Sequence, residues 1–402
     1  MSSNNTPRSE RLHICLYGRR NSGKSSLVNA FVGQDIALVS DTPGTTTDPV
    51  AKAVELGALG PCLITDTAGY DDEGALGESR VARTLKSLEH CDLALLVIES
   101  TNSMEDLGLE QAWLAHLQTR RIPTLVVLTK CELVADCEPL LLRLQQTLSL
   151  EHKPLALSSH QGTGLEALIP RLVALRPEDA EPRLITRGLV ASGDVVVLVM
   201  PQDASAPKGR LILPQVQTLR ELLDLGCNIV SCTPEGLQSS LDMLRQPPRL
   251  IITDSQAFRQ VEPLCPTETM LTSFSILMAG YKGDLPTLIE GARAIESLRP
   301  ESRILIAEAC SHAPASEDIG RVKIPALLRR RFGEGLQIEV YSGSDYPEDL
   351  QKYDLIIHCG GCMLNRQHVL ARLEQARSQG VAITNYGICM AYLGGILERV
   401  SW

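Results

Sequence analysis

The sequence predicts an α/β protein built from three α/β domains in succession. Its 402 residues exceed the usual size of a single domain, so two or three domains are expected. Short apolar runs, which are typical of buried parallel strands, alternate with helical patterns along most of the chain. A stretch rich in proline and acidic residues interrupts this alternation at 177–182. We therefore expect domains at residues 1–176, 183–265 and 266–402.

The composition limits the classes of function. The formal net charge is −10 and 3% of residues are aromatic, which argues against a large nucleic-acid surface, because such surfaces need basic stripes and stacking rings. The chain begins with polar residues, and no apolar run approaches the roughly 18 residues that span a membrane. We expect a cytoplasmic protein with no membrane or nucleic-acid partner. The twelve cysteines are then expected to be reduced thiols or metal ligands.

A phosphate-binding loop follows the first predicted strand, residues 12–17. It reads Gly18-Arg-Arg-Asn-Ser-Gly23-Lys24-Ser25, the G-x-x-x-x-G-K-S pattern, and an apolar helical pattern follows it. Backbone N–H groups would surround the phosphates, Lys24 would neutralise their oxygens, and the Ser25 hydroxyl would bind Mg²⁺. The expected nucleotide contacts in this loop are Gly18, Asn21, Ser22, Gly23, Lys24, Ser25 and Ser26.

Four further motifs follow in the order that GTP-binding proteins use. Thr46, within Pro43-Gly-Thr-Thr-Thr-Asp48, is expected to reach Mg²⁺ and the γ-phosphate. Asp66 and Gly69 follow an apolar strand in a D-x-x-G pattern, in which Asp66 would hold Mg²⁺ through water and the Gly69 amide would contact the γ-phosphate. The expected base-reading residues are Thr129, Lys130, Glu132, Ser158 and Ser159.

Together the five motifs predict a P-loop GTPase domain that hydrolyses GTP with Mg²⁺. They resemble those of the translation-factor-like GTPases, in particular the Era and TrmE branch with its P-G-T-T-x-D loop. Asn21 resembles the asparagine that binds K⁺ in TrmE-like GTPases, where K⁺ takes the place of an arginine finger. The expected catalytic residues are Lys24, Asn21, Thr46, Asp66 and Gly69.

Two departures from this resemblance bear on activity. The base-reading motif is Thr129-Lys-Cys-Glu132 rather than N-K-x-D, so guanine selectivity depends on whether the longer Glu132 side chain fits the base. Tyr70 follows Gly69, at the position where many GTPases have a glutamine that positions water. A tyrosine cannot orient that water in the same way, so we expect slow intrinsic hydrolysis.

The middle domain, residues 183–265, has α/β periodicity but no visible site. Apolar runs at 195–200, 227–232 and 250–254 predict strands, and a helical pattern covers 219–225. No glycine fingerprint or acid–base pair is present in this stretch. We expect a packing or assembly role, because pairing would cover the edges of such a small sheet. Cys227 and Cys232 are expected to be core thiols.

The third domain, residues 266–402, carries three thiols at the predicted ends of two strands. One apolar run stops at Glu308-Ala-Cys310, and another stops at His358-Cys359-Gly-Gly-Cys362, ahead of a helical pattern at 366–378. Neighbouring parallel strands have their carboxyl ends at one edge, where open α/β sheets bind ligands. Cys310, Cys359 and Cys362 would then meet at one place, as metal-binding thiolates do.

The thiols alone are compatible with three chemistries. A C-x-x-C pattern occurs in zinc, redox and iron–sulfur sites. Structural zinc needs four ligands, which the three cysteines with His312 or His358 would supply, whereas a redox pair would not need Cys310. A [4Fe–4S] cluster would bind three cysteines and leave one iron to a weaker ligand. From this chemistry alone, a zinc ion and a [4Fe–4S] cluster explain the thiols about equally well.

The whole pattern resembles the [FeFe]-hydrogenase maturation GTPases, the HydF family, because a GTPase domain, a middle α/β domain and a terminal C-x-H…H-C-x-x-C follow one another. The resemblance implies a small α/β dimerisation domain, a homodimer, and an α/β iron-sulfur cluster-binding domain with a [4Fe–4S] cluster on Cys310, Cys359 and Cys362. It also implies a scaffold or carrier. Such a protein receives a diiron precursor with CO, CN⁻ and dithiolate ligands from two radical-SAM maturases, and passes it to the apo-hydrogenase.

The fourth cluster ligand stays open in the sequence. Glu317 lies in a loop after Cys310, and an oxygen ligand there would exchange readily, which suits a carrier. His312 and His358 are its rivals. Cys389 follows the last predicted strand and is expected to pack in the core.

Two alternative functions remain from the residues. One is an Era- or TrmE-like GTPase that acts on RNA, with zinc holding an RNA-binding tail. The acidic balance, the few aromatic residues and the absence of a basic KH-type G-x-x-G module argue against it. The other is a regulatory GTPase with a structural zinc module, which metal analysis would distinguish from a cluster carrier.

Overall fold

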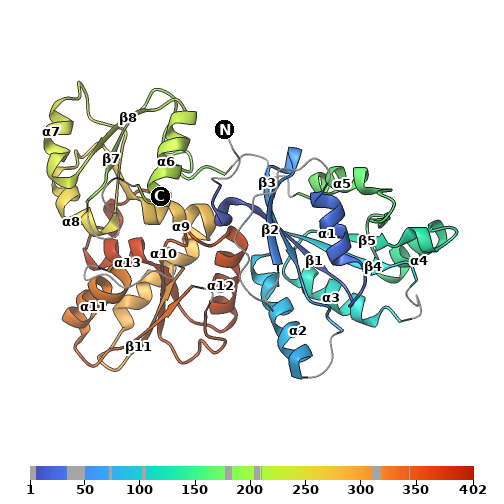
Figure 1. The fold of residues 1–402 in the computed structure, drawn as a ribbon. Coiled ribbons are helices and arrows are strands. Elements are labelled where there is room, and N and C mark those ends of the chain that lie inside the picture. The colour runs from blue at the N-terminus through green and yellow to red at the C-terminus, as the bar shows by residue number, and fades with distance from the viewer. Residues whose placement is uncertain are drawn as a thin grey trace. The chain divides into compact units, whose positions relative to one another are not determined.

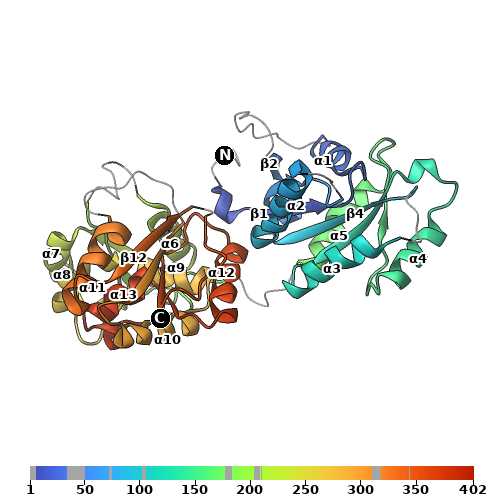
Figure 2. The same ribbon diagram turned by 90° about the horizontal axis from the view of Figure 1, so that it is seen from below.

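The computed structural model describes residues 6–33, 50–71, 75–101, 106–176, 183–202, 209, 211–309, 318–343 and 345–402. The fold is α/β, as predicted, with three sheets whose strands are largely parallel (Figures 1 and 2). The chain divides into two compact units, Met1–Ala180 and Glu181–Trp402. In the described residues, no helix combines the length and the apolar character needed to cross a membrane.

The N-terminal unit is built on a six-stranded sheet with the order β2-β3-β1-β4-β5-β6. Only β2 runs antiparallel to its neighbour, and the other pairs are parallel. The strands are β1 (Leu12–Tyr17), β2 (Val50–Glu55), β3 (Pro61–Asp66), β4 (Leu93–Glu99), β5 (Thr124–Thr129) and β6 (Leu155–Ala156). The helices are α1 (Lys24–Val32), α2 (Ala75–Ser87), α3 (Gly108–Thr119), α4 (Glu138–Thr147) and α5 (Leu168–Leu175).

Both faces of this sheet are buried, which explains why its strands are continuous apolar runs. Side chains alternate along β1: Ile14 and Leu16 pack with α1 and α5, whereas Cys15 and Tyr17 pack with α3 and α4 on the other face. The central position of β1 places the loop that follows it at the middle of the carboxyl edge (Figure 1).

The second unit contains two parallel four-stranded sheets, with the orders β10-β9-β7-β8 and β12-β11-β13-β14. The first has the strands β7 (Val195–Val199), β8 (Asn228–Cys232), β9 (Leu250–Thr253) and β10 (Met270–Ser273). The second has β11 (Arg303–Glu308), β12 (Gln337–Ser342), β13 (Leu355–His358) and β14 (Ile383–Asn385). The helices are α6 (Leu213–Asp224), α7 (Leu237–Asp242), α8 (Phe258–Val261), α9 (Phe274–Lys282), α10 (Leu285–Arg293), α11 (Ile324–Phe332), α12 (Arg366–Ser378) and α13 (Tyr386–Leu393).

One apolar core joins the two sheets of this unit. It includes Val197 and Leu271 from the first sheet and Ile304 and Ile356 from the second. The strand β10 lies after the expected domain boundary at 266, yet it pairs in parallel with β9. A strand of four residues carries no local sign of which sheet it joins, because its partner lies elsewhere in the chain.

Helix α6 begins earlier than its apolar pattern indicates. The pattern covers 219–225, whereas the helix starts at Leu213. Pro214 occupies the first turn, where its missing N–H is tolerated, and the Ile212 amide donates to the Gln215 side chain at 3.1 Å. These polar start signals extend the helix beyond its apolar face.

Candidate functional site

The phosphate loop has the backbone that its sequence predicts. It connects the end of β1 to the start of α1 at Lys24, so its amides lie at a helix N-terminus. Asn21 and Gly23 have positive φ angles of 60° and 91°. A Cβ at Gly18 would lie 2.4 Å from the Val97 carbonyl oxygen, so β4 passes too close for any side chain there. The motif glycines are therefore required by space and by conformation.

Two residues of the loop are arranged for Mg²⁺ and phosphate. The Lys24 ammonium donates to the carbonyl oxygens of Gly18 (2.8 Å) and Arg19 (2.7 Å). The Ser25 hydroxyl donates to Asp66 Oδ2 at 2.5 Å. Asp66 Oδ1 is buried and has no hydrogen-bond partner among the described residues. An unpaired buried carboxylate oxygen is costly, so this pair of oxygen donors fits a hydrated Mg²⁺.

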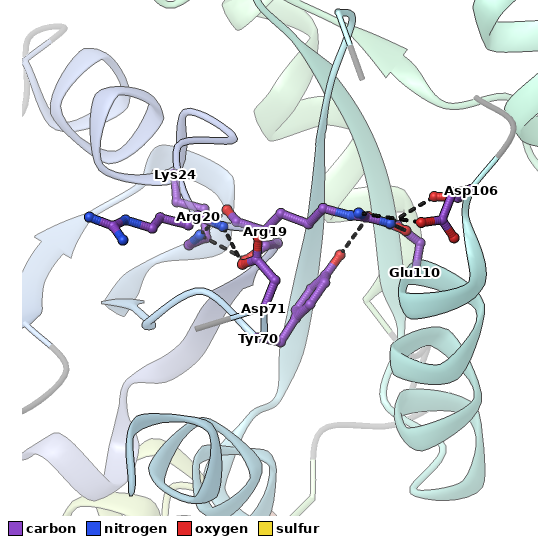
Figure 3. Close-up of polar contacts among 8 residues, drawn as sticks. Arg19, Arg20, Lys24, Tyr70, Asp71, Asp106 and Glu110 are labelled. Carbon is purple, nitrogen blue, oxygen red and sulfur yellow. Dashed lines mark hydrogen bonds and ion pairs between the residues drawn. The ribbon is translucent and has the colours of Figure 1, made fainter. Parts of the chain in front are cut away.

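The D-x-x-G segment contacts the phosphate loop directly. A Cβ at Gly69 would lie 2.6 Å from the Arg20 backbone nitrogen. The same Arg20 amide donates to Asp71 Oδ1 at 2.6 Å (Figure 3). Glycine is therefore needed at 69 because two backbones meet there. Thr46 lies outside the described residues.

Tyr70 is held against α3, because it stacks on Trp113 with the ring centroids 5.2 Å apart. Its hydroxyl donates to Glu110 Oε1 at 3.1 Å. Arg19 of the phosphate loop donates to the same carboxylate, from Nε at 2.6 Å and from Nη2 at 2.9 Å (Figure 3). Burial raises the pKa of Tyr70 well above its ordinary value, and Glu110 adds to this. The hydroxyl is thus a bound donor.

The base-reading residues lie at the ends of β5 and β6. The buried Thr129 hydroxyl donates to the Ser22 carbonyl oxygen at 2.6 Å, so it joins this loop to the phosphate loop. Ser158 bonds to Glu132 and lowers the pKa of that carboxyl. Glu132 Oε2 is buried without a partner among the described residues, so an acceptor is free for a base N–H. The remaining base-reading and loop residues are Lys130, whose ammonium pairs with Glu99, the half-buried Ser159 and the exposed Ser26.

The predicted parallel pairing of the thiol-bearing strands is confirmed. In the register of β11 and β13, Ala307 lies opposite His358, and the Cys359 amide donates to the Ala307 carbonyl oxygen at 2.9 Å. The Ala309 amide in turn donates to Cys359 Sγ at 3.0 Å, and the Gly361 amide lies 3.4 Å from the same sulfur. Two amide donors on one sulfur favour its thiolate form. Burial acts in the opposite direction and raises the pKa of Cys359 to about 11.

The described residues contain part of the predicted thiol site. Cys310, His312 and Glu317 lie outside the described residues. Within the part of the chain that the structure describes, no group of three or more His, Cys, Asp or Glu side chains is placed to hold a metal ion. Cys359, Cys362 and His358 are therefore the described members of the predicted set.

A buried lysine holds the turn between these two cysteines. Gly361 has a φ of 64°, and a Cβ there would lie 3.0 Å from Val369 Cγ2. Lys282, from the end of α9, donates to the carbonyl oxygens of Cys362 (3.1 Å) and Leu364 (2.9 Å). Lys282 thus holds the turn through backbone carbonyl oxygens, and these two bonds do not involve the thiol groups.

His358 has a structural set of contacts. Arg372 donates to its Nε2 at 3.2 Å, and its Nδ1 then donates to the Cys359 carbonyl oxygen at 2.7 Å. Burial and the Arg372 charge lower the pKa of His358 to about 4, so the ring is neutral. Ligation of a metal by this ring would break one of these bonds. Cys389 is fully buried in the core, as expected for a packing thiol.

Four residues near the two sites gave no signal in the sequence. Glu110 and Arg372 lie on helices, where charged residues are usually solvated, and both are almost fully buried. Lys282 lies in a Gly-Tyr-Lys-Gly stretch that carries no known pattern. Tyr386 directly follows the last strand, and this position is the one feature of the sequence that suggests a place near the thiol site. Their contacts come from segments distant in the chain.

Comparisons with known families match all three parts of the chain. Residues 286–401 match the family described as the hydrogen maturase F tetramerization domain, and residues 185–283 match the hydrogen maturase F dimerization domain. Residues 13–130 match the family described as 50S ribosome-binding GTPase.

Individual relatives match the GTPase portion. The tRNA modification GTPase MnmE of Acinetobacter baylyi is 34% identical over 175 residues, which cover 42% of this chain and 36% of that protein. MnmE of Bordetella petrii is 36% identical over 167 residues, covering 41% and 34%. The chain thus spans about a third of the length of these relatives. A solved structure of Era in complex with MgGDPNP and 16S ribosomal RNA nucleotides has 19% identity and a TM-score of 0.35, over 55% of this chain and 91% of that one.

The contacts around Glu110 generate a stability prediction. Replacing Glu110 by Gln removes the anionic partner of Arg19, and we expect the free energy of unfolding of the N-terminal unit to fall by about 2–3 kcal/mol. Tyr70→Phe removes only one hydrogen bond and should cost about 1 kcal/mol. Urea unfolding measures both values. Wild-type stability in the Glu110 variant would show that the carboxylate does not bind this loop to α3.

Proposed function

Because this chain belongs to the hydrogen maturase F family, we propose that it is a GTP-hydrolysing scaffold in [FeFe]-hydrogenase maturation. In this proposal the cytoplasmic protein binds a [4Fe–4S] cluster in its last domain and carries the diiron precursor of the hydrogenase cofactor. The precursor, with its CO, CN⁻ and dithiolate ligands, comes from two radical-SAM maturases and passes to the apo-hydrogenase. The observation that carries the proposal is the thiol pair at the edge of a parallel sheet, in a chain that begins with a GTPase domain.

The GTP site contains residues that support hydrolysis. The phosphate loop and Lys24 bind the phosphates, Ser25 and Asp66 hold Mg²⁺ together with Thr46, and the free oxygen of Glu132 accepts the base N–H groups. Tyr70 is engaged with Glu110, so no described side chain replaces the water-positioning glutamine. Asn21 would hold a K⁺ ion, which would supply the positive charge that an arginine finger supplies in other GTPases. Intrinsic turnover is therefore slow and depends on the cation.

The thiol site supports the cluster through its donor set. Cys359 and Cys362 lie on a turn fixed by Lys282, and two amides donate to the sulfur of Cys359. Cys310 is the third proposed ligand, and a cluster on three cysteines supplies an iron with an exchangeable ligand. His358 already uses both ring nitrogens, so Glu317 and His312 are the better candidates for the fourth ligand.

The middle domain supports a homodimer. Val216 and Leu223, one heptad apart on α6, are 46% and 54% exposed, and Leu211 just before the helix is 41% exposed. Helix α6 packs beside β8, which is an edge strand of its sheet. An apolar helix face next to an open strand edge is a surface that a second copy would cover.

An RNA-directed function is the weaker candidate. The tRNA modification GTPases resemble only 42% of this chain, and the remaining domains match hydrogen maturase F families. The formal net charge of −10 also disfavours an RNA surface.

Anaerobic reconstitution with iron and sulfide tests the cluster. We expect about four irons per chain and a reduced-state EPR signal, both lost in Cys310→Ser, Cys359→Ser and Cys362→Ser, because each thiolate binds one iron. Cys389→Ser is the matched control, since that thiol is buried in the core, and it should retain the signal. About one zinc per chain with no iron chromophore would contradict the proposal.

Cation dependence tests the role of Asn21. Replacing K⁺ by Na⁺ should slow GTP hydrolysis at least about tenfold, because the charge that replaces an arginine finger is lost. Asn21→Gly removes the amide but accepts the φ of 60°, so it should be slow in both salts. Lys24→Ala should abolish turnover altogether. Equal rates in K⁺ and Na⁺ for the wild type would exclude the K⁺ site.

Light scattering tests the dimer surface. Leu223→Glu should convert the dimer into a monomer of 43.8 kDa without lowering the melting temperature, because the side chain is exposed in the single chain. Met243→Glu, at a side chain 72% exposed beyond α7, is the control and should leave the mass unchanged. A dimer that survives Leu223→Glu would exclude α6 from the interface.

A further inference from the structure

A buried hydroxyl without a partner lies at the carboxyl edge of the last sheet. Tyr386 is 9% exposed, and its hydroxyl has no hydrogen-bond partner among the described residues. Buried tyrosine hydroxyls usually find a partner, because leaving a polar group unpaired in the interior costs free energy. The unpaired hydroxyl of Tyr386 therefore needs an explanation, and no sequence motif suggests one.

The strand register places Tyr386 beside Cys359. His358 pairs with Ala307 on one side and with Asn385 on the other. The positions directly after these paired residues are Glu308, Cys359 and Tyr386, so all three follow the same row of the sheet. Neighbouring strands lie about 4.8 Å apart, which brings Tyr386 next to the thiol residue.

The Tyr386 side chain extends from the end of β14 toward Glu308 at the end of β11, and β13 lies between these two strands. A Cβ at Gly320 would lie 2.0 Å from the Tyr386 oxygen and 3.0 Å from Glu308 Oε1. The Glu308 carboxylate already accepts from Arg321 and from the Ser342 hydroxyl. Burial raises the pKa of Tyr386 well above its ordinary value, and Cys359 and Glu308 add to this. A phenolic hydroxyl with no partner among the described residues can donate one hydrogen bond.

We propose that the Tyr386 hydroxyl donates a hydrogen bond to the sulfur-rich metal group bound by Cys359 and Cys362, and so acts as a positioning residue. The inference rests on the proposed function, because it assumes that these thiolates bind such a group. Sulfide and thiolate sulfurs of an iron–sulfur cluster carry negative charge and accept hydrogen bonds. The amides of Ala309 and Gly361 already donate to Cys359, and Tyr386 adds a side-chain donor with unused capacity.

The physical consequence is a shift in reduction potential. Reduction adds negative charge to the metal group, and a hydrogen-bond donor stabilises that charge. The Tyr386 hydroxyl should therefore raise the potential and slow the release of iron. In the metal-free protein the same hydroxyl should contribute nothing to stability, because it has no partner among the described residues.

Tyr386→Phe in the anaerobically reconstituted full chain tests the inference. The ring and its packing stay, so the metal-free variant should melt at the wild-type temperature or slightly above it. The loaded variant should show a more negative reduction potential and release iron to a chelator about fivefold faster, as expected for one lost hydrogen bond. Tyr392→Phe is the control on the same helix, because that hydroxyl donates to Glu296 at 2.7 Å, and it should change neither value.

The outcomes separate this inference from the function on which it rests. A wild type that takes up no iron overturns both. A wild type that loads normally, with the same potential and release rate in Tyr386→Phe, overturns the inference alone. A lower melting temperature of the metal-free variant with unchanged loaded properties also overturns it, because the partner would then be a protein group such as Glu308.

Discussion

The parallel pairing of β11 with β13 is the constraint on which the thiol site depends. It joins two segments 50 residues apart, since the Ala309 amide donates to Cys359 Sγ. Parallel neighbours cannot be linked by a tight turn, so each of their carboxyl ends opens into a separate connection. The connection after β11, which contains Cys310 in the sequence, and the turn after β13 therefore start at the same edge. Without this pairing, the two segments that carry the thiols would not start at the same edge of the sheet.

Both candidate sites are held by buried charges that contact the backbone or side chains of a loop. In the second unit, Lys282 donates to the carbonyl oxygens of Cys362 and Leu364, and Arg372 orients His358. In the first unit, the Glu110 carboxylate binds Arg19 of the phosphate loop. In each case the charged group comes from a helix that packs beside the loop and contributes no ligand of its own. Support of this kind holds each loop in place through groups other than the proposed ligands.

The sequence predicts the elements of the fold better than their partners. The apolar runs, the helical pattern and the spacing of the phosphate-loop motif locate the phosphate loop, the strands β11 and β13, and the helix Arg366–Ser378, because each is encoded by local spacing. The assignment of β10 to the first sheet of the second unit is not encoded locally. Nor are the contacts of Lys282 and Tyr386, because they depend on which strands become neighbours after folding. Long-range packing decides them.

We infer that thiolates at this sheet edge bind an iron–sulfur cluster in a GTPase. Anomalous diffraction at the iron and zinc absorption edges, from anaerobic crystals of the reconstituted protein, tests it most directly. We expect strong iron peaks within bonding distance of Cys359 Sγ and Cys362 Sγ, at roughly 2.3 Å for a metal–thiolate bond. A zinc peak at these sulfurs, or no metal peak at all, would contradict it.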